Sequence, residues 1–106
     1  MTGDFGTMIQ RAREAGACEG ALEEVKEYKS FEEFVEKCER APEYLCWYAL
    51  EVIKGRWPEA EPVIMKDAEW AYRYALEVIK GRWPEAEPVI MKDAFWSIIY
   101  TREVEK

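Results

Sequence analysis

Two pairs of glutamates have a spacing that could support acid–base chemistry. Glu59 and Glu61 flank one alanine, and Glu85 and Glu87 repeat that arrangement 26 residues later. Paired carboxylates can act as a general acid and a general base. Each pair also lies before or at the start of a predicted short helix, where negative charge complements the positive end of the helix dipole. We favour this structural role and predict no catalytic residue.

Other patterns typical of catalysis or cofactor binding are absent from the sequence. The chain has no histidine, so it can form no Ser-His-Asp triad and has no imidazole base. The GxxxxGK[ST] and GxGxxG patterns that bind phosphate groups are also missing. We therefore predict a protein that is not an enzyme and that binds no cofactor.

The three cysteines, Cys18, Cys38 and Cys46, are an odd number and include no CxxC pair. Because the chain has no histidine, a zinc site would need all three thiolates together with a carboxylate or a second subunit. We favour reduced, buried thiols and predict no metal site.

Length and composition indicate a single packed domain over residues 1–106. Hydrophobic residues make up 49% of the chain and aromatic residues 14%, which argues against disorder. No apolar run approaches the ~18–20 residues needed to span a bilayer. The first residues lack the basic start and apolar run of a secretory signal, so we expect a cytoplasmic protein.

A segment of 21 residues occurs twice without a single difference. Residues 48–68 are identical to residues 74–94, at an offset of 26. Self-similarity at a fixed period indicates repeated structural units, with atypical units at the ends. We predict an all-α fold in which short αα-hairpins of about 26 residues stack like a solenoid. The predicted parts are acidic, non-identical helices over residues 1–47, one repeat over 48–73, and a second over 74–106 that ends in a truncated capping helix.

Capping residues and apolar spacing predict where the helices lie. Thr7 and Ser30 each begin a capping box, TMIQ and SFEE, and the first of these helices should end near Gly16. Apolar residues at helical spacing predict further helices. The predicted helical segments after the first are residues 18–28, 31–38, 42–54, 62–66, 68–80 and 94–106.

Eight residues are predicted to form the joints between successive repeats. Glycine suits a left-handed helix end, and aspartate suits the cap of the following helix. The joint residues are Gly55, Arg56, Trp57 and Asp67 in the first copy, and Gly81, Arg82, Trp83 and Asp93 in the second.

Two joint residues have alternative roles. Arg56 and Arg82 would pair with Asp67, Glu61 or their equivalents in a ladder of salt bridges between repeats, or would present guanidinium groups to a partner. Trp57 and Trp83 would fill the joints, or would be exposed anchors for a partner, since Trp and Arg dominate interface hot spots. In both cases we favour the structural role.

The net charge of −7 is concentrated in the non-repeated part of the chain. Residues 19–43 hold nine glutamates against four basic residues, a local balance of −5. Such a surface repels phosphate backbones, so we expect no direct binding to nucleic acid. It would face a basic partner protein, or it would serve only as a soluble helical face. The predicted acidic face consists of Glu19, Glu23, Glu24, Glu27, Glu32, Glu33, Glu36 and Glu39.

Two stretches resemble known small proteins. Residues 16–47, GACEGALEEVKEYKSFEEFVEKCERAPEYLCW, resemble the N-terminal segment of small prokaryotic and phage proteins. Residues 55–75, GRWPEAEPVIMKDAEWAYRYA, are similar to a tandem repeat found in phage and bacterial proteins. The family has no established activity, and the resemblance implies a phage or mobile-element setting in a bacterial host. The chain departs from the family pattern in RAPEY at residues 40–44, where Arg-Gly-Asp-Trp is usual, and in having Ala68 and Ala94 where proline often follows the aspartate.

These observations lead to two hypotheses about function. The first is a helical repeat module that binds another protein, in its most specific form an acidic inhibitor of a nucleic-acid-handling protein. An anti-CRISPR or other anti-defence protein, an antitoxin or an immunity protein would fit this description. The alternative is a structural or self-assembling repeat protein with no separate target. The oligomeric state is left open.

Overall fold

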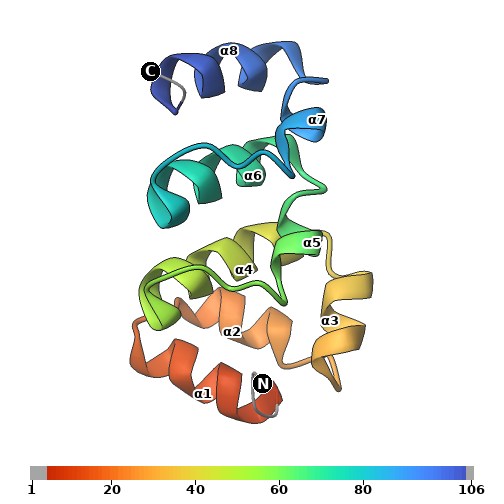
Figure 1. Ribbon diagram of the computed structural model, residues 1–106. Coiled ribbons are helices and arrows are strands. Elements are labelled where there is room, and N and C mark those ends of the chain that lie inside the picture. Colours follow the sequence, from red (N-terminus) through yellow and green to blue (C-terminus); the bar gives the residue numbers. More distant parts are fainter. Residues whose placement is uncertain (1–4, 105–106) are drawn as a thin grey trace. The chain divides into compact units, whose positions relative to one another are not determined.

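The computed structural model describes residues 5–104, and within them the chain is entirely helical (Figure 1). None of these helices is long and apolar enough to span a membrane. The α-helices are α1 (Phe5–Glu14), α2 (Glu19–Val25), α3 (Phe31–Lys37), α4 (Ala41–Tyr48), α5 (Glu61–Ile64), α6 (Ala68–Tyr74), α7 (Glu87–Ile90) and α8 (Ala94–Glu103). Two π-helical turns, η1 (Ala49–Ile53) and η2 (Ala75–Ile79), extend α4 and α6. The predicted all-α class is therefore confirmed.

The chain divides into two compact units. The first ends at Ala41 and contains α1 to α3, and the second begins at Pro42 and contains the helices that follow. The boundary falls at the start of α4, so nearly all of this helix belongs with the repeated segments. Sequence identity alone had placed the start of the repeats at residue 48.

The core of the first unit is a cluster of aromatic rings around Phe34. This side chain is 3% exposed. The ring centroids of Phe5, Tyr28 and Phe31 lie 5.7, 5.9 and 6.4 Å from it. These rings come from α1, from the segment after α2, and from α3, so the cluster holds all three helices of the unit together.

In the second unit, the two identical segments adopt the same local structure. α5 and α7 begin at equivalent glutamates, and η1 and η2 have the same sequence, ALEVI. Figure 1 shows α4, α6 and α8 in successive layers of this unit, connected through the short helices α5 and α7. Small side chains allow this close packing, since Ala60, Ala71, Ala75 and Ala86 are completely buried.

Side-chain caps begin three of the helices. Ser30 Oγ accepts a hydrogen bond from the backbone N–H of Glu33 at 3.1 Å, which caps α3. Asp67 and Asp93 cap α6 and α8 by accepting the N–H groups of Trp70 and Trp96. These caps satisfy amide groups that have no partner inside a helix.

The prediction that Thr7 caps the first helix is wrong. α1 already begins at Phe5, so Thr7 lies in its first turn and not before it. The expected end near Gly16 is correct. α1 ends at Glu14, and Gly16 follows with a φ of 99°, a conformation that glycine adopts at little cost.

The prediction that Gly55 and Gly81 supply the left-handed helix ends is also wrong. The residues with left-handed geometry are Lys54 and Lys80, with φ angles of 62° and 63°. The wide π-helical turn shifts the end of the helix by one residue. In each copy, the N–H groups of the lysine and of the following glycine both point to the carbonyl oxygen of the same alanine, Ala49 or Ala75. Position in the turn, and not residue type, decides which residue takes the strained conformation.

We predict that replacing either left-handed lysine with glycine stabilises the protein. A residue with a Cβ atom is strained in this conformation, and glycine is not. Lys54→Gly or Lys80→Gly should raise the free energy of unfolding by about 0.5–1 kcal/mol, measured by urea titration. The control variant Lys54→Ala removes the same side chain but keeps Cβ. A gain of equal size in that control would contradict the proposed cause.

Candidate functional site

Each joint of the second unit contains a network of polar side chains built around one glutamate. Arg56 donates two hydrogen bonds to the Glu61 carboxylate, from Nε at 2.9 Å and from a terminal nitrogen at 3.0 Å. The Glu61 side chain is only 13% exposed, and a bidentate arginine fits a carboxylate that is largely removed from water. This places Glu61 at the first turn of α5 and fixes the loop that precedes it.

The hydroxyl of Tyr74 completes the network from the following helix, α6. It donates a hydrogen bond to Glu61 Oε2 at 2.8 Å and accepts one from the backbone N–H of Trp57 at 2.7 Å. Tyr74 is fully buried. One side chain of α6 therefore satisfies a loop amide and a carboxylate that are distant in the sequence.

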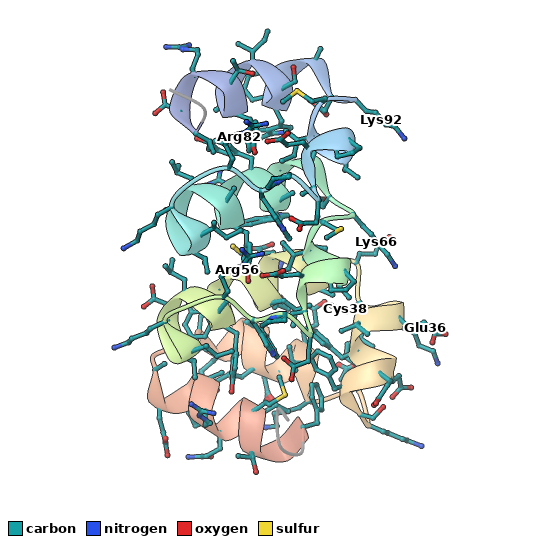
Figure 2. All side chains as sticks on the ribbon, viewed as in Figure 1. Glu36, Cys38, Arg56, Lys66, Arg82 and Lys92 are labelled. Carbon is teal, nitrogen blue, oxygen red and sulfur yellow. The ribbon has the colours of Figure 1, made fainter. Side chains whose placement is uncertain are left out.

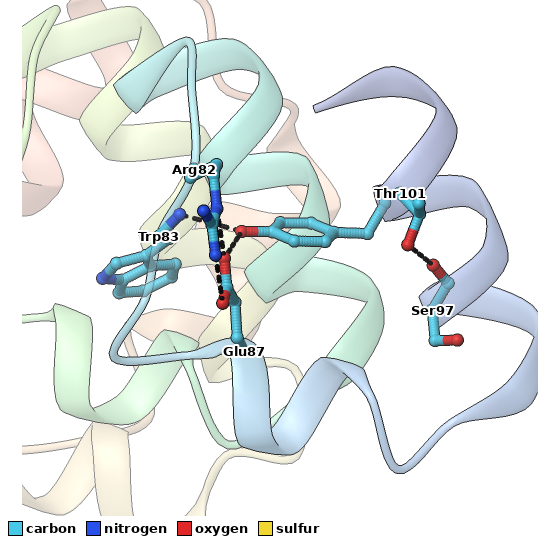
Figure 3. A network of polar contacts seen from close by, with 6 residues as sticks. Arg82, Trp83, Glu87, Ser97 and Thr101 are labelled. Carbon is cyan, nitrogen blue, oxygen red and sulfur yellow. Dashed lines mark hydrogen bonds and ion pairs between the residues drawn. The ribbon is translucent and has the colours of Figure 1, made fainter. Parts of the chain in front are cut away.

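The second copy reproduces this network (Figure 3). Arg82 binds Glu87 at 2.9 and 3.0 Å, and the Tyr100 hydroxyl lies 2.7 Å from Glu87 Oε2 and 2.9 Å from the Trp83 N–H. Tyr100 lies outside the identical segments, on α8, and is also fully buried. Arg56 and Arg82 occupy equivalent places in the two copies, as do Lys66 and Lys92 (Figure 2).

Trp57 and Trp83 lie inside the joints. They are 3% and 0% exposed, so neither indole is an exposed anchor for a partner. The Trp57 ring packs against Tyr48 at 5.1 Å, and the Trp83 ring packs against Tyr74 at 4.8 Å. Each indole thus contacts the tyrosine that lies 9 residues before it in the sequence, at the end of the preceding helix.

The hydrogen bonds change the acidity of the joint residues. Burial raises the pKa of Glu61, but the bonds from Arg56 and Tyr74 outweigh this effect and leave the pKa below its ordinary value. The pKa of Glu87 is lowered by Arg82 and Tyr100. Burial is the main cause that raises the pKa of Tyr74. Each joint therefore holds an ionised carboxylate and a protonated phenol at neutral pH.

Two predictions about these residues need correction. Arg56 and Arg82 pair with a glutamate of their own joint, five residues away, and form no ladder of salt bridges from repeat to repeat. The connection to the next helix is a tyrosine hydroxyl instead. Asp67 and Asp93 pair with no arginine in the joint network, because their carboxylates accept backbone N–H groups as helix caps.

Sequence reasoning missed Tyr74 and Tyr100 as joint residues. A signal for them was present, because tyrosines recur at positions 48, 74 and 100 with the repeat's own spacing of 26. Tyr100 keeps this register although most residues around it differ from those around Tyr74. A residue type that persists where its neighbours change indicates a specific contact.

The glutamates considered for acid–base chemistry have different environments. Glu61 and Glu87 are held by arginine and tyrosine, whereas Glu59 and Glu85 are exposed. The geometry assigns the first pair a structural function in the joint. In the first unit, the Glu33 carboxylate is similarly occupied: it accepts the Lys29 N–H at 2.7 Å, and this bond is the main cause that lowers its pKa.

Most of the predicted acidic face is exposed to solvent. Glu24 is partly buried and accepts a hydrogen bond from Cys38 Sγ at 3.6 Å, and Glu33 is also partly buried. Glu36 points outward from α3 (Figure 2). The six exposed members are Glu19, Glu23, Glu27, Glu32, Glu36 and Glu39.

The cysteines are free thiols in two kinds of environment. Cys38 and Cys46 are buried, and burial raises the pKa of both, that of Cys46 to about 12. Cys18 is exposed, so the prediction that it is buried is wrong. It precedes α2 with an extended backbone, and helical spacing therefore does not apply to it. Within residues 5–104, no three Cys, Asp or Glu side chains are grouped as ligands of a metal ion.

No protein-family model matches this chain, and comparisons with curated proteins and with solved structures give no match either. The resemblance of residues 16–47 and 55–75 to phage and bacterial proteins therefore stays a prediction.

We predict that removing one joint hydroxyl destabilises the protein. Tyr74→Phe or Tyr100→Phe leaves a buried loop N–H without its acceptor, which should lower the free energy of unfolding by ~1–3 kcal/mol. Tyr72→Phe is the control, because Tyr72 is 8% exposed but is not part of either joint network. Urea unfolding should show little change for this control, and equal losses in all three variants would argue against the role of the joint.

We also predict that the joint carboxylates contribute to acid sensitivity. Because the pKa values of Glu61 and Glu87 are lower in the folded state, their contribution to stability is present above the ordinary glutamate pKa. It is lost as the pH falls through the folded-state values, below about pH 4.5.

The double variant Glu61→Gln with Glu87→Gln should be less stable at neutral pH and should lose less stability than the native chain on acidification. Denaturant titrations at several pH values between 7 and 3 measure this difference. Glu59→Gln with Glu85→Gln is the matched control and should follow the native pH dependence. A joint variant that loses as much stability as the native chain would contradict the prediction.

Proposed function

We propose that the protein is a non-enzymatic module of stacked helical repeats that binds another protein through its acidic first unit. The recurrence of one Arg–Glu–Tyr–Trp network at an interval of 26 residues supports the repeat architecture. Each copy needs only the helix that follows it to complete its joint. Stacking of this kind extends a rigid scaffold without new packing solutions.

The observation that carries the binding proposal is the difference between the carboxylates of the two units. In the second unit, Glu61 and Glu87 are fixed in the joints. In the first unit, six glutamates on or next to α2 and α3 are exposed. Exposed charges of one sign attract a partner of the opposite sign and increase the rate of encounter.

A basic surface that normally binds nucleic acid is the partner that fits these charges best. Carboxylates at a surface can occupy the positions of phosphates in such a channel. In this proposal the protein is an acidic inhibitor of a nucleic-acid-handling protein. An anti-CRISPR or other anti-defence protein, an antitoxin or an immunity protein would act in this way.

The test is affinity capture from a bacterial lysate with two matched charge variants. One variant carries Gln at Glu19, Glu23, Glu32 and Glu36 of the first unit, and the control carries Gln at Glu51, Glu59, Glu77 and Glu85 of the second. The native chain and the control should retain a nucleic-acid-binding protein at low salt, and the first-unit variant should not. High salt or added heparin should release it, since charge pairing is screened by ions.

Capture that is unaffected by the first-unit substitutions would overturn the assignment of the acidic face. Failure of the native chain to retain any nucleic-acid-binding protein at low salt would overturn the proposed partner class.

A further inference from the structure

The surface of α8 carries an unusual group of exposed apolar side chains. Within residues 5–104, the exposed large hydrophobic residues are Met91, Phe95 and Ile98, at 42, 61 and 60%. Their spacing of four and three residues places Phe95 and Ile98 on one face of α8, with Met91 just before the helix. Arg102, four residues after Ile98, continues this face and is exposed.

The equivalent face of α6 is covered by another helix of the chain. Tyr72 corresponds to Ile98 at the offset of 26 and is only 8% exposed. Its ring packs against Trp96 of α8, with the centroids 5.5 Å apart. The guanidinium of Arg73 also lies over the Trp96 ring, at 5.9 Å. The outer face of α8 is therefore the place at which this architecture packs a further helix.

The sequence of α8 is not that of a helix adapted to face water. The last layer of a stack requires a polar outer face to be soluble. At this position the change runs the other way, because Phe95 stands where the first copy has Glu69. The truncated capping helix predicted from the sequence thus leaves the end of the second unit apolar.

We propose that this face is the dimerisation surface of the protein, and that it binds the same face of a second copy. Antiparallel pairing of two α8 helices around a two-fold axis near Ile98 makes the contact self-complementary. Phe95 of each copy then faces Thr101 and Arg102 of the other. An arginine over an aromatic ring is a contact that the chain already uses, with Arg73 5.1 Å from the Trp70 ring.

Charge favours a second copy at this surface. The whole chain carries −7, so two copies repel each other over most approaches. α8 carries one arginine and one glutamate, Arg102 and Glu103, and no net charge. It is a segment where two acidic chains can meet without opposing charges. The proposal does not depend on the partner of the first unit, because it concerns a different surface.

The first test compares the mass of two variants with that of the native chain by sedimentation equilibrium over a concentration series. Phe95→Glu with Ile98→Glu adds two negative charges to the face, and Phe95→Glu restores the residue type of the first copy. The native chain should be a dimer that dissociates at micromolar concentration or below. The variant should dimerise at least roughly 100-fold more weakly, because the contact would bury unpaired charges.

Lys66→Glu is the matched control, since it changes the net charge by the same two units at an exposed site on the other copy. It should dimerise like the native chain, and circular dichroism should show that all three proteins are folded. A native chain that stays monomeric, or a dimer that survives both glutamates on α8, would overturn the proposal.

A second test needs no disruptive substitution. In a Cys18→Ser background, Ile98→Cys should form a disulfide-linked dimer under mild oxidation, because two copies of this residue meet at the axis. Lys66→Cys in the same background should remain monomeric on a non-reducing gel. Equal cross-linking of both variants, or none at residue 98, would contradict the pairing.

Discussion

A buried tyrosine hydroxyl at each joint connects a loop to the helix that follows it, and the second unit depends on this contact. The hydroxyl accepts the N–H of a tryptophan and donates to a glutamate that an arginine also holds. Burying these groups separately would be costly, because an amide or a carboxylate removed from water needs a partner. Together they satisfy one another, and the loop can lie against the helix. The tryptophan side chains can then be buried beside the tyrosines of the preceding helices.

The same constraint separates two classes of glutamate in the chain. Glu61 and Glu87 are fixed by their partners, and substitution there acts on the fold. The exposed glutamates of the first unit have no comparable position in a buried network, and their charges face solvent. Charge at such positions influences solubility and the choice of partner more than the fold. This difference directs the search for binding towards α2 and α3 and away from the repeated joints.

The two ends of the second unit's repeated pattern also differ in what they require. A repeat buries its apolar face against the next repeat, so the last helix must either become polar or find another partner. α6 is covered by α8, whereas α8 itself exposes Phe95 and Ile98. The architecture that makes extension of the chain simple is thus the reason why its last layer presents a surface suited to association.

Local chemistry in the sequence was sufficient to predict the helical class, most helices and the caps at Ser30, Asp67 and Asp93, because these depend on neighbouring residues. It failed where the outcome depends on geometry over a longer range. The left-handed residues are lysines and not the adjacent glycines, since the π-helical turns shift the register by one. The arginine partners and the tyrosine bridge also required the tertiary structure, because residues 17 positions apart meet only when the helices pack.

The identical segments show the limit most directly. Met65 and Met91 have the same neighbours in the sequence for many residues on either side, yet Met65 is partly buried and Met91 is 42% exposed. The sequence determined the local fold of both copies, including their joints. Which surfaces are covered was decided by the layer that follows each copy, since burial is a property of the packing around a residue and not of the residue itself.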